Sequence, residues 1–412
     1  MDQAPHELID LRRELPVLGQ CIYLNTGTAG PLPRCASDAI QGAAELERTQ
    51  GRGDFRSFGA FLEVREAARS LVAQLLHAAP REIALTHHTS DGVNIVLWGL
   101  RWKPGDELVT TSLEHDAVAV PAGVLARRLG VQARFADIGL GDQALGAVAA
   151  ALSPRTRLLV LSHVMYSTGA ALPVAPIVKL AHEQGVQVLV DGAQSCGVVP
   201  VDVRELEVDY YTVSGQKWLC GPEGTGALYV RADRLGELEA TFASYFSAAH
   251  HDFAGQVALH DDARRFESGM VYRPALHGFR ASLAWMLESV GIARAAERSV
   301  ALARAARAML ESIEGVTLRT PEACQAGLLS FDLPAFSPAR LRALASRWAA
   351  ERQLIVRSID HRPYALRASF GFFNTEAEVA ELTSAVRDAA QQGPSAVVPL
   401  AGHSPLPDHR EG

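Results

Sequence analysis

The fold is decided by the stretch VDYYTVSGQKWLCGP, residues 208–222, together with VLVDGAQS at residues 188–195. Each stretch begins with a short run of Val, Leu or Tyr and ends in small or polar residues. That pattern predicts a buried strand with functional groups at its carboxyl end. The first strand end carries the carboxylate of Asp191, and the second carries the amine of Lys217. We therefore expect a lysine and an aspartate at neighbouring strand ends.

A lysine and a carboxylate in this arrangement are the groups that pyridoxal phosphate (PLP) needs. The amine bonds to the aldehyde carbon of the cofactor, and the carboxylate keeps the pyridine nitrogen protonated so that the ring can accept electrons. The alternative is a lysine and an aspartate on unrelated turns. The motifs around Lys217 and Asp191 favour the first interpretation.

Three motifs carry a resemblance to a known family: DGAQS (191–195), SGQKW (214–218) and GPEGTG (221–226). They resemble those of class V aminotransferases and cysteine desulfurases, which are fold-type I PLP enzymes. The resemblance runs from about Tyr23 to the helix expected after Asn374. Within the group, the chain is most similar to the cysteine/cystine C–S lyase branch, on the stretch HTSDGVNIVLWGL (88–100) and on an aromatic residue at position 166. The resemblance implies PLP as cofactor, a small amino acid as substrate and a homodimer with active sites near the subunit interface.

The bulk composition limits the function classes. The 412 residues are 48% hydrophobic and 21% charged, which is ordinary for a globular protein of two or three domains. The net charge of −7 implies no polyanionic partner such as nucleic acid, and no apolar run is long enough to cross a bilayer. No secretory signal is recognisable at the N-terminus. The five cysteines are scattered and odd in number, so we predict reduced thiols and a cytoplasmic location.

Apolar strands and helices alternate through the first two thirds of the chain. This predicts an α/β fold with a mostly parallel sheet covered on both faces, with ligands beyond the carboxyl ends of the strands. The resemblance makes this the seven-stranded type of sheet of a fold-type I large domain. We expect strands at residues 82–88, 105–111, 130–135, 157–163, 187–191, 208–214 and 226–230, and helices at 35–49, 61–76, 93–100, 143–152 and 176–184.

A smaller α+β domain is expected towards the C-terminus. A long helical region (274–313) precedes strands at 327–332, 354–357 and 365–369 and helices at 338–351 and 375–391. The irregular segment 241–260 is expected as a loop over the site that decides the substrate together with residues 55–61. The expected organisation is an N-terminal arm (1–20), a large PLP-binding domain (21–265), the long helix with the small domain (266–391) and a Pro/Gly-rich tail, disordered or draped (392–412).

A phosphate site is expected where Thr89 and Ser90 open a helix, because hydroxyls and free amides at a helix N-terminus bind anions. The alternative is an ordinary Ser/Thr cap. Asp91 would repel a phosphate, so we expect it to point away. Ser214 is a further cofactor-binding candidate. Gln216 stands where the family usually has a histidine; its amide can donate to a phosphate but cannot titrate, which leaves Lys217 as the proton shuttle.

The resemblance assigns further positions. It places His115 against the cofactor ring and Gln194 on the side of the ring phenolate. Tyr166, in HVMYSTG (163–169), stands where desulfurases place an asparagine near that phenolate. Met270 stands where the family has a threonine that reaches the phosphate of the partner subunit, so this contact is in doubt.

Arg367 matches the family's anchor for the substrate carboxylate, since a guanidinium can bind a carboxylate through two parallel hydrogen bonds. Arg357 is the second candidate. The stretch IVRSIDHRPYALR (355–367), where desulfurases carry a nucleophilic cysteine, contains none. We therefore expect a PLP-dependent C–S lyase that β-eliminates sulfur from a cysteine- or cystine-like amino acid. A class V aminotransferase, an epimerase of secondary metabolism and a desulfurase-like enzyme are the alternatives, and a PLP-binding protein without turnover is a fourth.

Other classes of site lack their spacing. A Gly-x-Gly-x-x-Gly motif does not follow any strand, the paired histidines are adjacent in sequence, and neither Cys-x-x-Cys nor Gly-x-Ser-x-Gly occurs. We expect no metal, no dinucleotide and no nucleic-acid surface.

Overall fold

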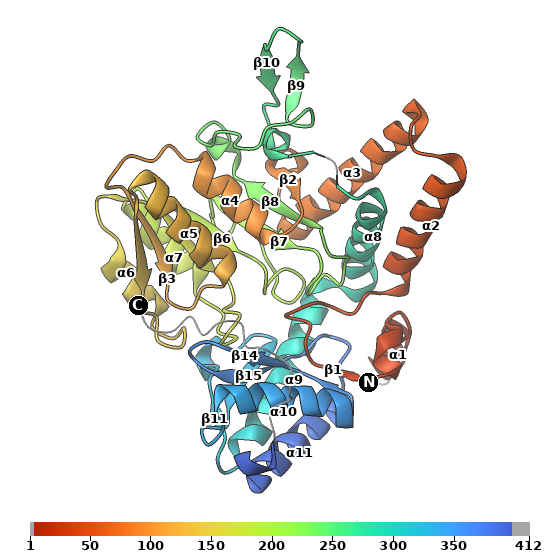
Figure 1. Cartoon of the computed structure of the whole chain (residues 1–412), viewed down its shortest axis with the longest axis vertical. Coiled ribbons are helices and arrows are strands. Elements are labelled where there is room, and N and C mark those ends of the chain that lie inside the picture. Colours follow the sequence, from red (N-terminus) through yellow and green to blue (C-terminus); the bar gives the residue numbers. More distant parts are fainter. Residues whose placement is uncertain (1–3, 270, 398–412) are drawn as a thin grey trace.

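The computed structural model describes residues 4–269 and 271–397. Met270, and with it the expected loss of a cross-subunit phosphate contact, lies outside the described residues. Figure 1 shows a large sheet-and-helix body with a smaller sheet-and-helix body below it, joined by the region of α8 (Arg273–Ala284) and α9 (Ile292–Glu311).

The large body is built on a seven-stranded sheet in the order β2-β8-β7-β6-β5-β3-β4. β8 runs antiparallel to both of its neighbours, and the other pairings are parallel. The predicted α/β fold-type I architecture with its mostly parallel seven-stranded sheet is therefore confirmed. The strands are β2 (Ile83–Thr86), β3 (Glu107–Thr111), β4 (Gln132–Ala136), β5 (Thr156–Ser162), β6 (Gln187–Asp191), β7 (Tyr210–Ser214) and β8 (Gly226–Val230).

Both faces of this sheet are buried, because successive side chains of each strand point to opposite sides. In β6, Leu189 packs with α4 and α5, whereas Val188 and Val190 pack on the other side with α3, α6, α7 and α8. The helices of the large body are α2 (Arg34–Gln50), α3 (Phe55–Leu76), α4 (Thr89–Gly99), α5 (Asp116–Leu129), α6 (Ala144–Ala151), α7 (Val174–Glu183) and α8 (Arg273–Ala284), and the chain begins with α1 (Ala4–Arg13).

The small body holds an antiparallel sheet in the order β11-β12-β15-β14. Its core includes buried residues of α9, α10 and α11, among them Leu302, Trp348 and Leu382. Near the N-terminus, β1 pairs in parallel with β13, and Leu24 joins the small body's core. We therefore propose that this first segment is shared between the two domains. The bounds are β1 (Ile22–Tyr23), α9 (Ile292–Glu311), β11 (Thr317–Leu318), β12 (Leu328–Asp332), α10 (Pro338–Arg352), β13 (Leu354–Ile355), β14 (Arg357–Ile359), β15 (Ala365–Ser369) and α11 (Glu376–Gln392).

Four local predictions were wrong. The segment predicted as an irregular loop over the site contains a two-stranded antiparallel hairpin, β9 (Ala248–His251) with β10 (Val257–Leu259), which projects away from both bodies (Figure 1). Residues 55–61 are the first turns of α3 rather than a pocket loop, because the Asp54 carboxylate caps the helix by accepting from the Ser57 amide. The strand predicted at 354–357 is broken at Val356 into β13 and β14. The predicted long helix is divided by a π-helical turn (Trp285–Val290) and Gly291.

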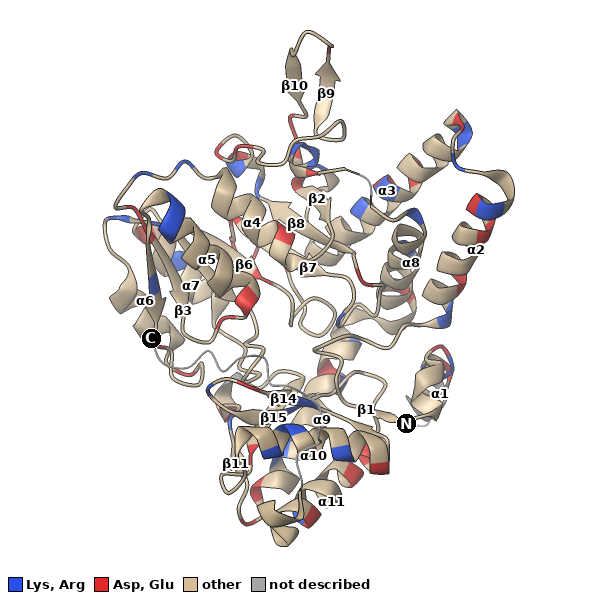
Figure 2. Ribbon diagram, in the orientation of Figure 1, with Lys and Arg blue, Asp and Glu red and all other residues tan. Residues whose placement is uncertain are grey.

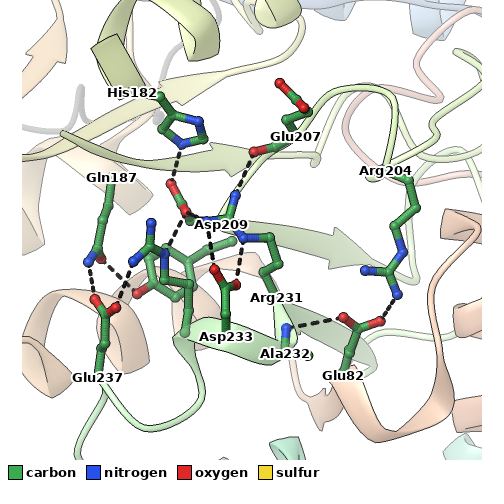
Figure 3. A network of polar contacts seen from close by, with 12 residues as sticks. Glu82, His182, Gln187, Arg204, Glu207, Asp209, Arg231, Ala232, Asp233 and Glu237 are labelled. Atoms are coloured by element: carbon green, nitrogen blue, oxygen red, sulfur yellow. Dashed lines mark hydrogen bonds and ion pairs between the residues drawn. The ribbon is translucent and has the colours of Figure 1, made fainter. Parts of the chain in front are cut away.

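Charge is distributed in both signs over the helices of both bodies in the view of Figure 2. A buried acidic hub lies at the amino end of β7, opposite the strand ends that carry the candidate site (Figure 3). There the Asp209 carboxylate accepts from the Val188 amide at 2.7 Å and from Arg234 Nε at 2.8 Å, and it pairs with Arg231 and His182. Across the described residues, the helices are too short or too polar to span a membrane.

Candidate active site

A cavity of about 260 Å³ opens at the carboxyl ends of the central strands, between the two bodies. The fold brings every site residue predicted from the sequence to its wall: Thr89, Ser90, His115, Tyr166, Asp191, Gln194, Ser214, Gln216, Lys217, Arg357 and Arg367. Gly27, Thr28, His88, Ala117, Ser162, Val164 and Ala193 complete the lining and were not predicted. Ser162 ends β5 and Ala193 closely follows β6, so the strand-end rule that picked out Asp191 could have found both.

Lys217 follows β7 in a tight turn. The turn is held by the Gly215 amide, which donates to the Thr225 carbonyl, and by the Gly221 amide, which donates to the Gly215 carbonyl. Gly215 has no room for a side chain, since a Cβ there would lie 2.2 Å from Thr225 Oγ1. Burial lowers the pKa of Lys217 to about 8; Arg367 acts in the same direction and Asp191 opposes it. A substantial fraction of this amine is therefore neutral near pH 7–8, the form that attacks a carbonyl.

Asp191 ends β6 and is 2% exposed. Its Oδ1 accepts from the Ala193 amide at 2.8 Å and from Thr212 Oγ1 at 3.2 Å. Among the described residues, nothing hydrogen-bonds to its other carboxylate oxygen. A buried carboxylate with one free oxygen is suited to accept a proton-bearing ring nitrogen.

The N-terminus of α4 lines the same cavity as Lys217 and has the groups that a seat for an anion needs. Thr89 and Ser90 occupy the first helical turn, where backbone amides have no partner within the helix. His88 caps the helix, with its Nδ1 accepting from the Asp91 amide at 3.2 Å. The Asp91 carboxylate accepts from the amide and from the ring of His87, at 3.0 and 2.8 Å. Asp91 therefore points away from the seat, as predicted.

His115 and Tyr166 form an aromatic corner of the cavity, with ring centroids 4.7 Å apart in an edge-to-face arrangement. His115 caps α5, and its Nδ1 accepts from the Ala117 amide at 3.0 Å, which places the proton of the neutral ring on Nε2. Burial lowers the pKa of His115, and the Lys217 charge lowers it further. The ring is therefore neutral at pH 7.

A second buried acid lies behind this corner. The Glu114 carboxylate accepts from Thr111 Oγ1, from the Ser162 amide and from Ser162 Oγ, at 2.8, 3.0 and 2.6 Å. Burial raises the pKa of Glu114 to about 7, although the hydrogen bonds from Ser162 act in the opposite direction. Ser162 also lines the cavity and pairs with Asp191 across the sheet, so Glu114 supports the cavity wall from behind.

Gln194 connects the site to the glycine-rich turn after β1. Its Nε2 donates to the Gly27 carbonyl at 2.7 Å, and its Oε1 accepts from the Trp218 indole at 2.9 Å. A Cβ on Gly27 would lie within 3.1 Å of Gln194, Ser369 and Arg367. This close approach explains why position 27 is a glycine.

Two arginines come to the cavity from the small body. Arg357 of β14 and Arg367 of β15 are register partners in neighbouring antiparallel strands. Arg367 donates to the Tyr166 carbonyl at 2.8 Å and to Thr28 Oγ1 at 3.1 Å, and within the described residues its Nε has no hydrogen-bond partner. Burial lowers the pKa of Arg367 to about 9, and Arg357 contributes in the same direction. An anion between the two guanidinium groups would relieve this cost.

The arrangement fits PLP: a lysine of lowered pKa, a buried carboxylate with one free oxygen, an anion seat at a helix N-terminus and an imidazole on the cavity wall. Fold and site together define a fold-type I PLP-dependent enzyme. More particularly, the chain belongs to the class V aminotransferase family: residues 22–382 match the family described as "Aminotransferase class-V".

Similar proteins indicate which members of the family the chain resembles. The chain is 30% identical over 400 residues to a probable cysteine desulfurase of Methanothermobacter thermautotrophicus, covering 93% of this chain and 98% of that one. It is 31% identical over 383 residues to isopenicillin N epimerase of Streptomyces clavuligerus, covering 89% and 94%. Among solved structures it is similar to the cystine C–S lyase C-DES in complex with its product, cysteine persulfide (TM-score 0.86, 31% identity, 91% and 99% covered). A mutant of that lyase carries glycine covalently linked to its PLP cofactor (TM-score 0.85, 30% identity, 92% and 99% covered). The protein is thus a desulfurase-like or C–S-lyase-like PLP enzyme.

Proposed function

We propose that the protein is a PLP-dependent C–S lyase that β-eliminates a sulfur leaving group from a cysteine- or cystine-like amino acid. The observation that carries the proposal is the absence of a thiol where desulfuration needs one. Desulfuration leaves alanine and requires a thiolate to attack the substrate sulfur, yet the stretch 355–367 beside Arg367 contains no cysteine.

The cysteines closest in sequence to the site residues do not replace that thiol. Cys196 and Cys220 are buried, and neither contributes to the cavity wall. Burial raises the pKa of each thiol to about 12, so both are protonated at neutral pH and are poor nucleophiles.

Bound PLP supplies an electron sink that stabilises negative charge at the substrate α-carbon. Lys217 would hold the cofactor aldehyde and, once displaced by the substrate amine, take the α-proton; its lowered pKa suits both roles. Asp191 would keep the ring nitrogen protonated through its free oxygen. The α4 amides with Thr89, Ser90, Ser214 and Gln216 would bind the phosphate, while the neutral His115 ring, Tyr166 and Gln194 would hold the ring in place.

Arg367, seconded by Arg357, would bind the substrate carboxylate. A guanidinium fork fixes a carboxylate in one plane, which orients the bond to be broken perpendicular to the ring. The close register of the two arginines and their unrelieved charge support this assignment. We also propose that the protein is a homodimer, because several large aromatic side chains are exposed. We place it in the cytoplasm, because its cysteines are scattered and odd in number.

Epimerisation is a second candidate reaction, because the chain is similar to isopenicillin N epimerase. Like elimination, epimerisation removes the α-proton, but it needs no leaving group. The deciding assay incubates the PLP-loaded enzyme with cystine and with S-substituted cysteines, with and without a keto acid. We expect pyruvate and ammonia with a sulfur product, independent of keto acid, and faster turnover of cystine than of cysteine because a persulfide is the better-stabilised leaving group. Alanine as main product, dependence on a keto acid, or racemisation alone would contradict the proposal. The Lys217→Ala variant is the negative control.

A further inference from the structure

A contact between the two bodies stands at the edge of the cavity and has no role in the chemistry above. His361 lies in the short loop between β14 and β15, and its Nε2 hydrogen-bonds to the hydroxyl of Tyr166, which follows β5 in the large body. The two ring centroids are 5.2 Å apart. The contact joins residues 195 positions apart in the chain, so only the fold brings them together.

Tyr166 lies beside the groups assigned to cofactor and substrate. Its ring meets the edge of His115, its backbone carbonyl accepts from the carboxylate-binding Arg367, and its side chain lines the cavity. Tyr166 is 9% exposed, whereas His361 lies in the solvent-exposed loop. The pair therefore connects the buried cavity wall to water.

The tautomer of His361 is set by the loop itself. Its Nδ1 lies 3.1 Å from the Arg362 carbonyl, which can only accept, so Nδ1 carries a proton. When the ring is neutral, Nε2 accepts the Tyr166 hydroxyl proton. When the ring is cationic, Nε2 donates to the Tyr166 oxygen, and the hydroxyl proton is free to point into the cavity.

Elimination of a poorly stabilised thiolate needs an acid, and the other titratable groups of the cavity are unsuited to supply the proton. His115 is neutral, Lys217 is assigned to the α-proton, His88 caps α4, and an arginine does not give up its proton. We propose that Tyr166, reprotonated by His361, is the proton donor to the departing sulfur, an inference that rests on the proposed elimination. The pair would serve thioether and thiol leaving groups, which depart as poorly stabilised thiolates.

The step balances as follows. The electron pair left at the α-carbon by proton removal forms the Cα=Cβ bond as the C–S bond breaks. The pair of the C–S bond goes to sulfur, which takes the proton of the Tyr166 hydroxyl. The Tyr166 oxygen takes the Nε2 proton of His361, and the imidazole is recharged by a proton from water. Lys217 separately holds the α-proton, so neither an oxidant nor a reductant is required.

The test compares two leaving groups. β-Chloroalanine loses chloride, which needs no proton, and S-methylcysteine loses methanethiolate, which does. In Tyr166→Phe and His361→Asn, the ratio of kcat/KM for S-methylcysteine to that for β-chloroalanine should fall by roughly 10²-fold, the usual contribution of a general acid. Asp360→Asn is the matched control, because it removes the same loop's ion pair with Arg342 and spares the Tyr166 contact; its ratio should stay within about twofold of wild type.

A second readout uses enzyme without substrate. The imidazole ¹⁵N shifts of His361 should report a protonated Nδ1, and Tyr166→Phe should move the Nε2 resonance. An unchanged ratio in His361→Asn, or equal slowing with both substrates, would overturn the relay while elimination of chloride to pyruvate still stands. Failure of the wild-type enzyme to form pyruvate from either substrate would instead overturn the proposed function and the relay with it.

Discussion

At the scale of single residues, the properties of Lys217 come from its neighbours. Burial removes water from the amine and lowers its pKa, and the Asp191 carboxylate partly offsets that shift. The reactivity of the lysine is therefore coupled to the group that would bind the ring nitrogen.

This coupling predicts a pH effect on cofactor capture. Only the neutral amine attacks the aldehyde, so the rate at which apo-protein takes up PLP should rise as pH increases through about 8. Because the Asp191 carboxylate raises the pKa of Lys217, Asp191→Asn should shift this midpoint to lower pH. The visible absorbance that develops after PLP is added measures the rate, and borohydride should then fix the cofactor to a Lys217 peptide. Asp116→Asn, an exposed change beside His115, should leave the midpoint in place. A label on another lysine, or no shift in Asp191→Asn, would contradict the assignment.

Arg367 allows a test of geometry at constant charge. Arg367→Lys keeps a cation but loses the fork, so substrate binding should weaken by roughly 1.5–3 kcal/mol, the scale of a charge-assisted hydrogen bond. The weaker binding should appear as a higher KM under steady-state conditions. Arg362→Lys, on the same small body but outside the cavity wall, is the control and should change KM little. If both variants behave like wild type, Arg357 is the anchor to test next.

At the scale of elements, the two ends of β7 have different roles: the carboxyl end leads to the candidate active site, and the amino end lies beside a buried ion-pair network. Its carboxyl end leads to Lys217, and its amino end begins beside the buried Asp209 hub of Figure 3. The hub ties β7 to β6 through the Val188 amide and to the segment after β8 through Arg231 and Arg234. The register of β6 and β7, and with it the separation of Asp191 and Lys217, depends on these contacts.

Asp209→Asn should therefore destabilise the protein. It leaves Arg231 and Arg234 without their buried counter-ion, a change that costs about 3–5 kcal/mol. Burial opposes ionisation of Asp209, but hydrogen bonds from His182 and Val188 outweigh it and hold its pKa below the ordinary value. The stabilisation is thus present above about pH 4 and is lost as pH falls further. Thermal unfolding at pH 7 and in acid measures both effects, and the gap between variant and wild type should narrow in acid. Asp233→Asn, at an exposed partner of Arg231, should cost less than about 1 kcal/mol.

The sequence was informative where the residues of a single strand form a recognisable pattern. The strand that ends at Asp191 and the strand before Lys217 are continuous apolar runs closed by small residues, so their edge could be predicted as the site. The β9–β10 hairpin gave no such signal, because β9 is Ala-Ala-His-His and β10 is only three residues long, so neither shows an alternating apolar pattern. An aspartate directly before a helical stretch is a recognised cap, so the start of α3 after Asp54 could also be predicted from the sequence. The Tyr166–His361 contact could not be predicted, because it depends on how the two bodies meet.

At the scale of the whole molecule, large apolar side chains are exposed along one stretch of the chain. Phe242, Tyr245, Phe253 and Tyr272 are 66%, 55%, 107% and 63% exposed, in the segment that includes the projecting hairpin and leads into α8. Exposed aromatic side chains concentrated in this way are typical of a surface that another chain covers. This concentration supports the proposed homodimer.

Light scattering should accordingly give a mass of twice 44.2 kDa for the wild-type protein. Phe253→Asp combined with Tyr272→Asp places two charges on the proposed interface, and their desolvation on association should shift the protein towards monomer. Phe135→Asp is the matched control, since Phe135 is 48% exposed on β4, the edge strand at one end of the sheet, and it should leave the mass unchanged. If the partner chain completes the active site, the double variant should also lose activity per chain on dilution, and wild type should not. A wild-type protein that is monomeric at assay concentration would contradict the proposed homodimer. A double variant that stays dimeric would place the interface elsewhere.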